Sequence, residues 1–325
     1  MKNILITGCA GFIGFHTSLK FIQNKNFRIY GIDNLNNYYD VKLKKERLKI
    51  LRKNDNFIFH KIDLCNYQIL IKKLKKIKFY NIFHLAAQAG VRYSINHPEE
   101  YVKSNLIAFH NILELSKNLK AEHLFFASTS SVYGNSKKFP LKENFNTDNP
   151  MTFYAATKKS NEVTAYSYSN IYNIPMTGLR FFTVYGPYGR PDMALFKFTK
   201  NIFKNKKIEI YNNGNHYRDF TYVEDVANIL VKLSINLNKK TKKYRILNIA
   251  SSKPIKLKKF LKTIEDFTNK RFKYNLLPLQ IGDVRKTHAD NKNLLNVIGK
   301  FNFTTIEVGI PLFIKWYIDF YIKKN

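Results

Sequence analysis

This chain of 325 residues lacks a set of cysteines and a long apolar run. Cys9 and Cys65 are its only cysteines, which excludes a disulfide framework and a cysteine-rich zinc site and leads us to expect a reducing, cytoplasmic compartment. No run of about 18 apolar residues occurs, so we expect no membrane-spanning helix. Nor does any cluster of His, Asp and Glu have the spacing of a metal site, and we expect no metal.

Acidic residues are also few, since 23 Asp and Glu stand against 55 Lys and Arg, for a formal net charge of +32. Such a charge would suit a nucleic acid or an anionic membrane. Only ten of the basic residues are Arg, however, and the lysines scatter along the chain. Because nucleic-acid surfaces rely on the planar fork of Arg, we interpret the charge as a solvated surface produced by compositional drift. We therefore expect no specific nucleic-acid partner and no membrane association.

The first half of the chain alternates short β-rich runs with helical patterns. We expect strands at residues 3–7, 27–33, 56–61, 81–86, 123–128 and 175–181, and helices near 12–23, 67–76, 98–119 and 153–172. Such alternation predicts βαβ units and an α/β fold, a Rossmann-like doubly wound parallel sheet. Residues 41–53 have the pattern of a basic amphipathic helix, whose apolar Leu48 and Leu51 we expect to face the core.

The second half is less regular and predicts a smaller mixed α/β unit. Its expected strands are residues 207–211, 220–221 and 245–249, and its expected helices lie near 193–203, 223–237, 256–268 and 305–321. The start of the chain resembles a signal peptide, but Gly8, Gly11 and Gly14 interrupt its apolar run, so we expect a buried strand followed by a turn.

Strand, glycine turn and helix together predict a dinucleotide site. Gly8 permits a tight turn, Gly11 lets the backbone approach a pyrophosphate, and Gly14 lets the helix pack on the strand. The helix N-terminus attracts the phosphates. Asp33 ends the second strand, 19 positions after Gly14, where an acidic residue binds both ribose hydroxyls. Because its carboxylate repels a 2′-phosphate, we expect NAD rather than NADP.

Further cofactor contacts are expected after the third and fourth strands. Asp63 and Leu64 are placed to hold the adenine edge, and the residues from Leu85 to Gln88 are small or flat enough to line the dinucleotide. The predicted cofactor-binding residues are Gly8, Gly11, Phe12, Ile13, Gly14, Asp33, Asn34, Asp63, Leu64, Leu85, Ala86, Ala87, Gln88, Asn105 and Lys158.

The candidate chemical residues lie mid-chain. Tyr154 and Lys158 are four positions apart and share one face of the expected helix. A tyrosine is a poor base because its unperturbed pKa is about 10, but a neighbouring ammonium and a cationic nicotinamide favour the phenolate and lower that pKa. Hydroxyl side chains from Ser128 to Ser131 follow the fifth strand. A lone Tyr-x-x-x-Lys is usually a surface pair; beside the glycine turn it predicts redox chemistry on a hydroxyl or ketone.

These motifs resemble the extended short-chain dehydrogenase/reductases, specifically the nucleotide-sugar epimerases. The resemblance covers residues 8–14, 33–35, 84–92, 128–134, 154–158, 180–187, 217–220 and 282–284. The run Gly-Arg-Pro-Asp-Met-Ala-Leu-Phe-Lys-Phe at 189–198 is similar to the UDP-glucuronate 4-epimerases. The resemblance implies NAD-dependent conversion of UDP-glucuronate to UDP-galacturonate through a 4-keto intermediate, with NAD kept tightly bound.

The resemblance also implies residue roles. Thr129 is the catalytic hydroxyl, Tyr154 the general base and acid, and Lys158 its partner. The substrate-binding residues it implies are Arg92, Ser130 and Ser131 beside the sugar, Thr183 and Arg190 at the sugar carboxylate, Arg218 at the diphosphate and Asp283 at the uridine ribose. Residues 1–180, with a return segment near 220–250, would bind NAD; residues 181–325 would mainly bind the UDP-sugar, interleaved with the first unit. Family members are commonly dimers, which implies a homodimer paired through helices 98–119 and 153–172.

Alternatives stay open at this point. They are a 4-epimerase of another UDP-sugar, either glucose/galactose or N-acetylated, a nucleotide-sugar dehydratase or decarboxylase, and a non-catalytic NAD-binding protein. Related 4,6-dehydratases carry an Asp-Glu pair just after the catalytic Thr, and uronate decarboxylases carry a Glu two positions after it. This chain has Ser130 and Ser131 there, so the acid that would handle the proton is missing and epimerisation is favoured.

Overall fold

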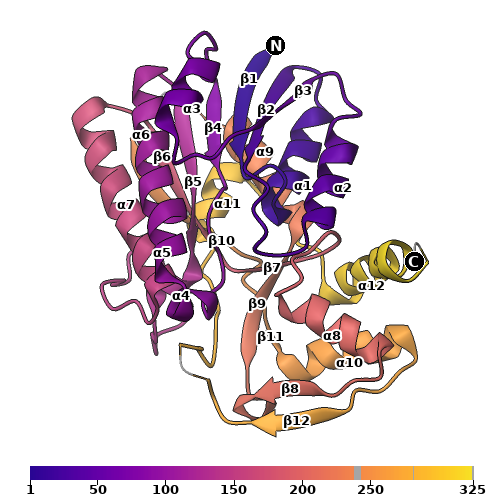
Figure 1. Ribbon diagram of the computed structural model, residues 1–325. Coiled ribbons are helices and arrows are strands. Elements are labelled where there is room, and N and C mark those ends of the chain that lie inside the picture. Colours follow the sequence, from indigo (N-terminus) through magenta and orange to yellow (C-terminus); the bar gives the residue numbers. More distant parts are fainter. Residues whose placement is uncertain (238–242, 281, 324–325) are drawn as a thin grey trace.

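The computed structural model describes residues 1–237, 243–280 and 282–323. A seven-stranded parallel sheet with the order β10-β6-β5-β4-β1-β2-β3 forms its larger part (Figure 1). The strands are β1 (Lys2–Thr7), β2 (Phe27–Asp33), β3 (Phe57–Lys61), β4 (Asn81–His84), β5 (His123–Thr129), β6 (Met176–Phe181) and β10 (Tyr244–Ile249). The predicted doubly wound α/β sheet is confirmed.

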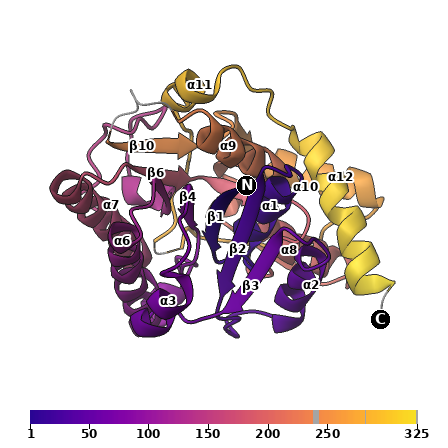
Figure 2. The ribbon, with the colours of Figure 1, turned by 90° about the horizontal axis from the view of Figure 1, so that it is seen from above.

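Helices cover both faces of this sheet (Figure 2). On one face lie α1 (Phe12–Ile22), α2 (Val41–Leu51), α9 (Val223–Ile235) and α11 (Lys292–Ile298); on the other lie α3 (Tyr67–Leu74), α6 (Ala108–Asn118) and α7 (Phe153–Tyr172). Successive side chains of a strand alternate between the two faces of the sheet. Ile4 and Ile6 therefore pack in the core layer on the α1 and α2 side, here called the first layer, and Leu5 packs in the second layer, on the α3 and α6 side. Leu48 and Leu51 are buried in the first layer, which confirms the core-facing interpretation of α2.

Several expected elements have different limits in the structure. The expected strand at 220–221 is the longer β9 (Tyr217–Tyr222), and the expected helix near 305–321 is α12 (Ile306–Tyr317) followed by η4 (Ile318–Ile322). Residues 98–119 are not one α-helix but α5 (Pro98–Tyr101), a π-helical segment η1 (Val102–Ile107) and α6. The expected strand at 81–86 ends at His84, because the chain then turns past the glycine turn; a Cβ atom on Gly8 would lie 2.7 Å from the Ala86 nitrogen. The end of β4 thus falls beside the glycine turn, at the edge where parallel strands end and ligands bind.

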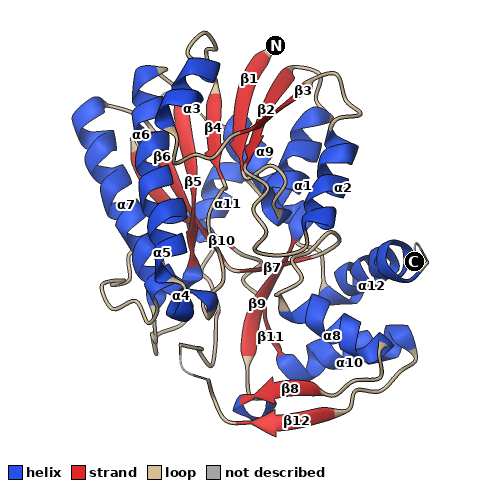
Figure 3. Ribbon diagram, viewed as in Figure 1, coloured by secondary structure: helices blue, strands red, loops and turns tan. Residues whose placement is uncertain are grey.

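Two small sheets, β11-β9-β7 and β12-β8, form the lower part of the molecule (Figure 3). Their strands are β7 (Thr183–Tyr185), β8 (Ile208–Tyr211), β9 (Tyr217–Tyr222), β11 (Pro254–Lys256) and β12 (Tyr274–Leu277). They share a separate core with α8 (Ala194–Phe203), α10 (Leu257–Thr268) and α12 (Ile306–Tyr317), which η4 (Ile318–Ile322) extends. The sequence analysis missed β7, β11, β12, α11 and α4 (Tyr93–Asn96), since such short elements show little periodicity.

The chain returns to the large sheet between these parts. Strand β10 pairs in parallel with β6, and α9 packs against α1. The chain leaves the large sheet for the small sheets where β7 follows the end of β6, and it returns from β9 through α9 to β10. These crossing segments join the core of the large sheet to the core of the small sheets. The end of the large sheet therefore faces the small sheets, and the site lies between them (Figure 1).

A buried ion pair fixes α7 against the end of the sheet. Arg180 on β6 donates to both carboxylate oxygens of Glu162 on α7, at 2.8 and 2.7 Å, and both side chains are nearly buried. The Ser128 hydroxyl donates to the same carboxylate at 2.6 Å. Because Arg180 and Ser128 are both hydrogen-bonded to Glu162 in this buried network, the network fixes the position of α7 along β5 and β6.

Glu162→Ala should lower the free energy of unfolding by about 3–5 kcal/mol, because the Arg180 guanidinium would stay buried without its partner. Urea denaturation measures this change. The matched control is Asp266→Ala, which opens the exposed pair with Lys262 and should cost about 1 kcal/mol or less. Equally small losses in the two variants would contradict the role of the buried pair.

Candidate active site

The glycine turn between β1 and α1 has the form of a phosphate cradle. Gly8 has a φ of +70°, and the Gly11 N–H donates to the Gly8 carbonyl at 2.9 Å. A Cβ atom on Gly14 would overlap the Gly8 carbonyl, so a side chain cannot be accommodated there. Gly11 is the N-cap of α1 and offers no side-chain acceptor to the first-turn N–H groups. The turn therefore fits a pyrophosphate bound by backbone N–H groups at a helix N-terminus.

Asp33 stands at the end of β2, beside this cradle. Its carboxylate accepts the Ala10 N–H at 3.1 Å and the Leu35 N–H at 2.8 Å, which fixes its orientation. Asn34 donates to Asp63 at 3.0 Å and so joins the segments that follow β2 and β3. Burial opposes ionisation of Asp63, but bonds from the Cys65 N–H and from Asn34 outweigh it and lower the pKa. These positions fit the adenosine end of a dinucleotide.

The loop after β4 lies against the glycine turn. Asn105 on η1 accepts the Gln88 N–H at 2.8 Å and donates to the Gln88 carbonyl at 3.1 Å and to Thr157 at 3.1 Å. Asn105 is fully buried, and its side chain contacts the loop after β4 through Gln88. Leu85, Ala86 and Ala87 stay partly exposed along the loop. A direct contact of Asn105 with the cofactor remains a prediction.

Thr129 and Tyr154 meet where β5 ends and α7 begins. Thr129 is the last residue of β5, and its hydroxyl accepts the Ser131 N–H at 3.1 Å. Tyr154 lies in the first turn of α7, which the Thr152 side chain caps by accepting the Ala155 N–H. Burial raises the pKa of Tyr154, and a hydrogen bond with Thr129 opposes that rise. The strand end and the helix start thus bring a hydroxyl and a phenol together.

Lys158 lies one helical turn further along α7 and is buried. Its Nζ donates to the Ala127 carbonyl at 3.0 Å, and burial lowers its pKa to about 7. Burial also raises the pKa of Tyr154, against the opposing effects of Thr129 and the Arg190 charge. Among the protein groups, desolvation of the phenol outweighs those that favour phenolate, and Lys158 is not one of the groups that shift its pKa. A lowering of this pKa by the ammonium and the cationic nicotinamide together stays a prediction.

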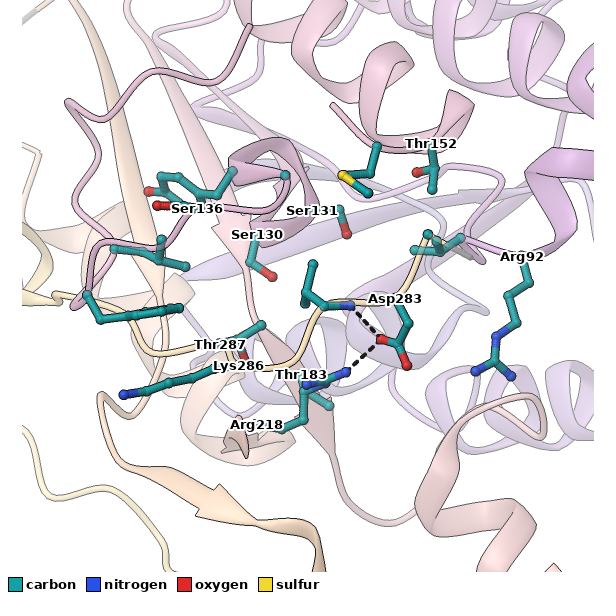
Figure 4. A pocket seen from close by; sticks show the side chains of 18 residues that line it. Arg92, Ser130, Ser131, Ser136, Thr152, Thr183, Arg218, Asp283, Lys286 and Thr287 are labelled. Atoms are coloured by element: carbon teal, nitrogen blue, oxygen red, sulfur yellow. Dashed lines mark hydrogen bonds and ion pairs between the residues drawn. The ribbon is translucent and has the colours of Figure 1, made fainter. Parts of the chain in front are cut away.

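A cavity open to solvent, of about 900 Å³, lies between the large sheet and the small sheets, and Ser130 and Ser131, which follow Thr129, line it (Figure 4). Six of the predicted substrate residues line it, namely Arg92, Ser130, Ser131, Thr183, Arg218 and Asp283. Arg218 donates to Asp283 at 2.6 Å, so this cation and this anion neutralise each other. The sequence analysis missed several polar lining residues, among them Ser136, Thr152, Lys286 and Thr287. Nothing in their local pattern separates them from ordinary loop residues.

Arg190 lies outside this lining, in a smaller, mostly apolar cavity of about 320 Å³. Thr183 lines both cavities and marks where they adjoin. The Arg190 guanidinium pairs with Asp192, through Nε to Oδ1 at 3.0 Å and through Nη2 to Oδ2. Asp192 also accepts a hydrogen bond from the Tyr38 hydroxyl at 3.2 Å. The sequence analysis assigned roles to Thr183 and Arg190 but missed Asp192 and Tyr38.

The described part of the chain shows neither a metal-ion site nor a membrane-spanning helix. In residues 1–237, 243–280 and 282–323, no three His, Cys, Asp or Glu side chains are grouped so that they could hold a metal ion. Within the same ranges, no helix combines the length and the apolar character needed to cross a membrane. His84, the last residue of β4, is buried with its Nδ1 2.9 Å from the Thr7 hydroxyl.

The chain was compared with known proteins. Residues 4–250 match the NAD dependent epimerase/dehydratase family. A probable UDP-glucuronate 4-epimerase of Rhizobium meliloti is 41% identical over 336 residues, 99% of this chain and 98% of the relative. The UDP-glucuronic acid 4-epimerase of Bacillus cereus, solved with UDP-glucuronic acid and NAD, is 28% identical, with a TM-score of 0.91 over 98% of this chain and 100% of that one. A UDP-N-acetylglucosamine 4-epimerase of Methanobrevibacter ruminantium is also 28% identical, with a TM-score of 0.86 over 98% of both chains.

The lowered pKa of Lys158 predicts a stability effect with a definite sign. Between the folded pKa of about 7 and the unfolded value of 10.5, only the unfolded chain binds this proton, so stability rises with pH in that window. The free energy of unfolding of the wild type minus that of Lys158→Met should therefore rise by roughly 1.4 kcal/mol per pH unit. Urea denaturation at several pH values measures it. Lys262→Met, at an exposed position, controls for loss of one charge. A pH-independent difference for Lys158→Met would contradict the shift.

Proposed function

The chain belongs to the NAD dependent epimerase/dehydratase family, and on that premise we propose that it is a UDP-sugar 4-epimerase acting on UDP-glucuronate. The observation that carries the proposal is that Thr129 ends β5 next to Tyr154 and Lys158 on α7, and that Ser130 and Ser131, which follow Thr129, line the large cavity. A dinucleotide fits on one side and a nucleotide-sugar on the other. The similarity to the probable UDP-glucuronate 4-epimerase of Rhizobium meliloti and to the Bacillus cereus enzyme solved with UDP-glucuronic acid supports the same proposal.

The residues present fit NAD, which when bound would supply a hydride acceptor and donor for C4 of the sugar. The turn from Gly8 to Gly14 would hold the pyrophosphate, and Asp33 the adenosine ribose. Leu85, Ala86 and Ala87 would line the groove towards the nicotinamide. Because the cofactor would return to its starting state in each cycle, its release is not part of the cycle, and tight binding of NAD would not slow kcat.

Tyr154 is proposed to take the proton from the sugar O4 and later return it. Its raised pKa suits the return, since a protonated phenol is a good donor near neutral pH. Removal of the proton needs stabilisation of the phenolate, for which the Thr129 hydrogen bond and the Arg190 charge are in place. Lys158, fixed on the Ala127 carbonyl, is proposed to hold the nicotinamide ribose one helical turn away.

The remaining roles are proposed from the positions of the charged groups. Arg218 would bind the diphosphate and Asp283 the uridine ribose, with Arg92 nearby in the same cavity. Ser130 and Ser131 would face the sugar, with Thr183 and Arg190 at its carboxylate. An Arg fork suits a planar carboxylate. We assign residues 1–180, with the return segment near 220–250, mainly to the cofactor and residues 181–325 mainly to the UDP-sugar.

A second candidate is 4-epimerisation of an N-acetylated or neutral UDP-sugar. The 98% coverage of the Methanobrevibacter ruminantium enzyme favours it as the alternative. Arg190 argues for the uronate, because a neutral sugar offers no carboxylate to a guanidinium placed beside Thr183.

The substrate is tested by incubating purified protein with UDP-glucuronate and no added cofactor, and separating the products by chromatography. Formation of UDP-galacturonate is expected, since retained NAD should suffice. A UDP-pentose as the main product would indicate a decarboxylase. No product from UDP-glucuronate, with turnover of UDP-glucose or UDP-N-acetylglucosamine, would overturn the choice of sugar.

Tyr154→Phe should lower kcat by about 10²–10⁴-fold, because it removes the group that moves the O4 proton. The NAD content of the purified variant should equal that of the wild type, since the glycine cradle is untouched. Tyr166→Phe, at an exposed position of the same helix, is the control and should retain wild-type kcat. Full activity of Tyr154→Phe would remove this residue from the mechanism.

We also propose a homodimer formed through α7 and the segment from α5 to α6, which pack side by side. Large apolar side chains are exposed on these helices, including Val163 (57%), Tyr166 (58%) and Ile171 (62%) on α7 and Ile107 (46%) on η1. Contiguous exposed apolar side chains of this kind mark association surfaces. Since Cys9 and Cys65 are both free, we propose a reducing, cytoplasmic setting.

Val163→Asp should convert a dimer to a monomer, because it places a charge in the centre of that apolar surface. Sedimentation velocity measures the mass in solution. Leu276→Asp, at a similarly exposed position on β12, is the control and should leave the mass unchanged. An unchanged mass for Val163→Asp, or a monomeric wild type, would contradict this interface.

A further inference from the structure

Arg190 is held in a fixed orientation by two residues that the mechanism has not used. Asp192 accepts from the Nε and the Nη2 of Arg190, which fixes the plane of the guanidinium. Tyr38 donates to Asp192 at 3.2 Å and thereby fixes the carboxylate. Tyr38 comes from the segment after β2, five positions beyond Asp33, whereas Arg190 and Asp192 follow β7. The contact therefore joins the cofactor side of the site to the sugar side.

The backbone of the loop that carries Arg190 is anchored at two further points. The Nε2 atom of His16 on α1 lies 2.9 Å from the Pro187 carbonyl. Arg47 on α2 donates to the Tyr188 carbonyl at 2.6 Å and to the Ala10 carbonyl at 2.7 Å. Because these contacts hold the main chain of the loop, the orientation of the Arg190 side chain depends on Asp192.

We propose that Asp192, supported by Tyr38, is a positioning residue that makes Arg190 present one fixed edge to the sugar carboxylate. This inference rests on the proposed function of the site. Nε and Nη2 are engaged by Asp192, and the guanidinium so fixed lines the cavity next to Thr183, where a planar anion could meet it. A guanidinium so restrained holds the carboxylate in one orientation instead of following its rotation.

The charge of Asp192 distinguishes positioning from simple affinity. An aspartate beside Arg190 weakens the attraction of that arginine for a second carboxylate, because like charges repel. A site selected only to bind an anion tightly would leave Arg190 unpaired. The pair therefore favours control of orientation over strength of binding.

Orientation matters because the carboxylate of a 4-keto uronate is β to the ketone. If the C5–C6 bond aligns with the carbonyl π system, it breaks; CO₂ leaves, its bonding electron pair passes to C5 and the C4 carbonyl, and C5 takes a proton from water. The product is a UDP-4-keto-pentose, and the two electrons removed at C4 stay on the NAD of the proposed function. Arg190, fixed by Asp192, would hold the carboxylate out of this alignment.

The test compares Asp192→Asn and Tyr38→Phe with the wild type on UDP-glucuronate. Chromatography gives the ratio of UDP-pentose products to UDP-galacturonate, and calorimetry gives the Kd for UDP-glucuronate. We expect that ratio to rise about tenfold or more in Asp192→Asn and less in Tyr38→Phe, since small misplacements have large effects on competing reactions. The Kd should stay equal or fall, because a negative charge is lost or loosened. Tyr274→Phe, at an exposed tyrosine of β12, is the matched control for loss of one hydroxyl.

A merely structural role would lower both products together and leave their ratio unchanged, and that result in Tyr38→Phe would overturn the inference even if Asp192→Asn did not fold. An increase of the Kd with an unchanged product ratio would also overturn it, since Asp192 would then serve binding alone. If the wild type makes UDP-galacturonate and the variants keep its product ratio, only this inference fails. If the wild type makes none, the proposed function fails and the inference falls with it.

Discussion

The hydrogen bond from Lys158 to the Ala127 carbonyl is the contact on which the arrangement of this site depends. It joins α7 to β5 two residues before Thr129, so that Tyr154, one helical turn earlier, comes to the end of that strand. The buried pair between Arg180 and Glu162 holds the same helix further along. The reacting groups are therefore placed by the packing of one helix on a parallel sheet, and a rigid scaffold of this kind positions them with little freedom.

Burial of these groups gives the site its electrostatic character. The same desolvation that lowers the pKa of Lys158 raises that of Tyr154, which keeps the phenol protonated unless positive charge is brought near it. Arg190 supplies such a charge from the small-sheet side, and its loop is anchored to α1 and α2. The large-sheet side and the small-sheet side of the site are thus coupled through one loop.

Local patterns predicted much of the large sheet but little of the contacts between its loops. The limits of β2 and α7 follow directly from periodicity and flanking residues, and the glycine turn is recognisable because its spacing is short. Tyr38 and Asp192 are 154 positions apart, and Arg47 and Tyr188 are 141 apart, so no local pattern could pair them. The effect of burial on Tyr154 was equally hidden, because desolvation depends on the folded surroundings. The π-helical break at η1 interrupts a helix whose sequence reads as continuous.

The central claim is that the hydrogen at C4 of the sugar is removed as a hydride and returned to the same carbon. The most direct measurement uses UDP-glucuronate deuterated at C4, incubated with the purified protein in ordinary water, with the product analysed by mass spectrometry and NMR. The account predicts that UDP-galacturonate keeps the deuterium at C4. Exchange of that deuterium for solvent hydrogen would contradict the account, because it would show that the C4 hydrogen leaves as a proton.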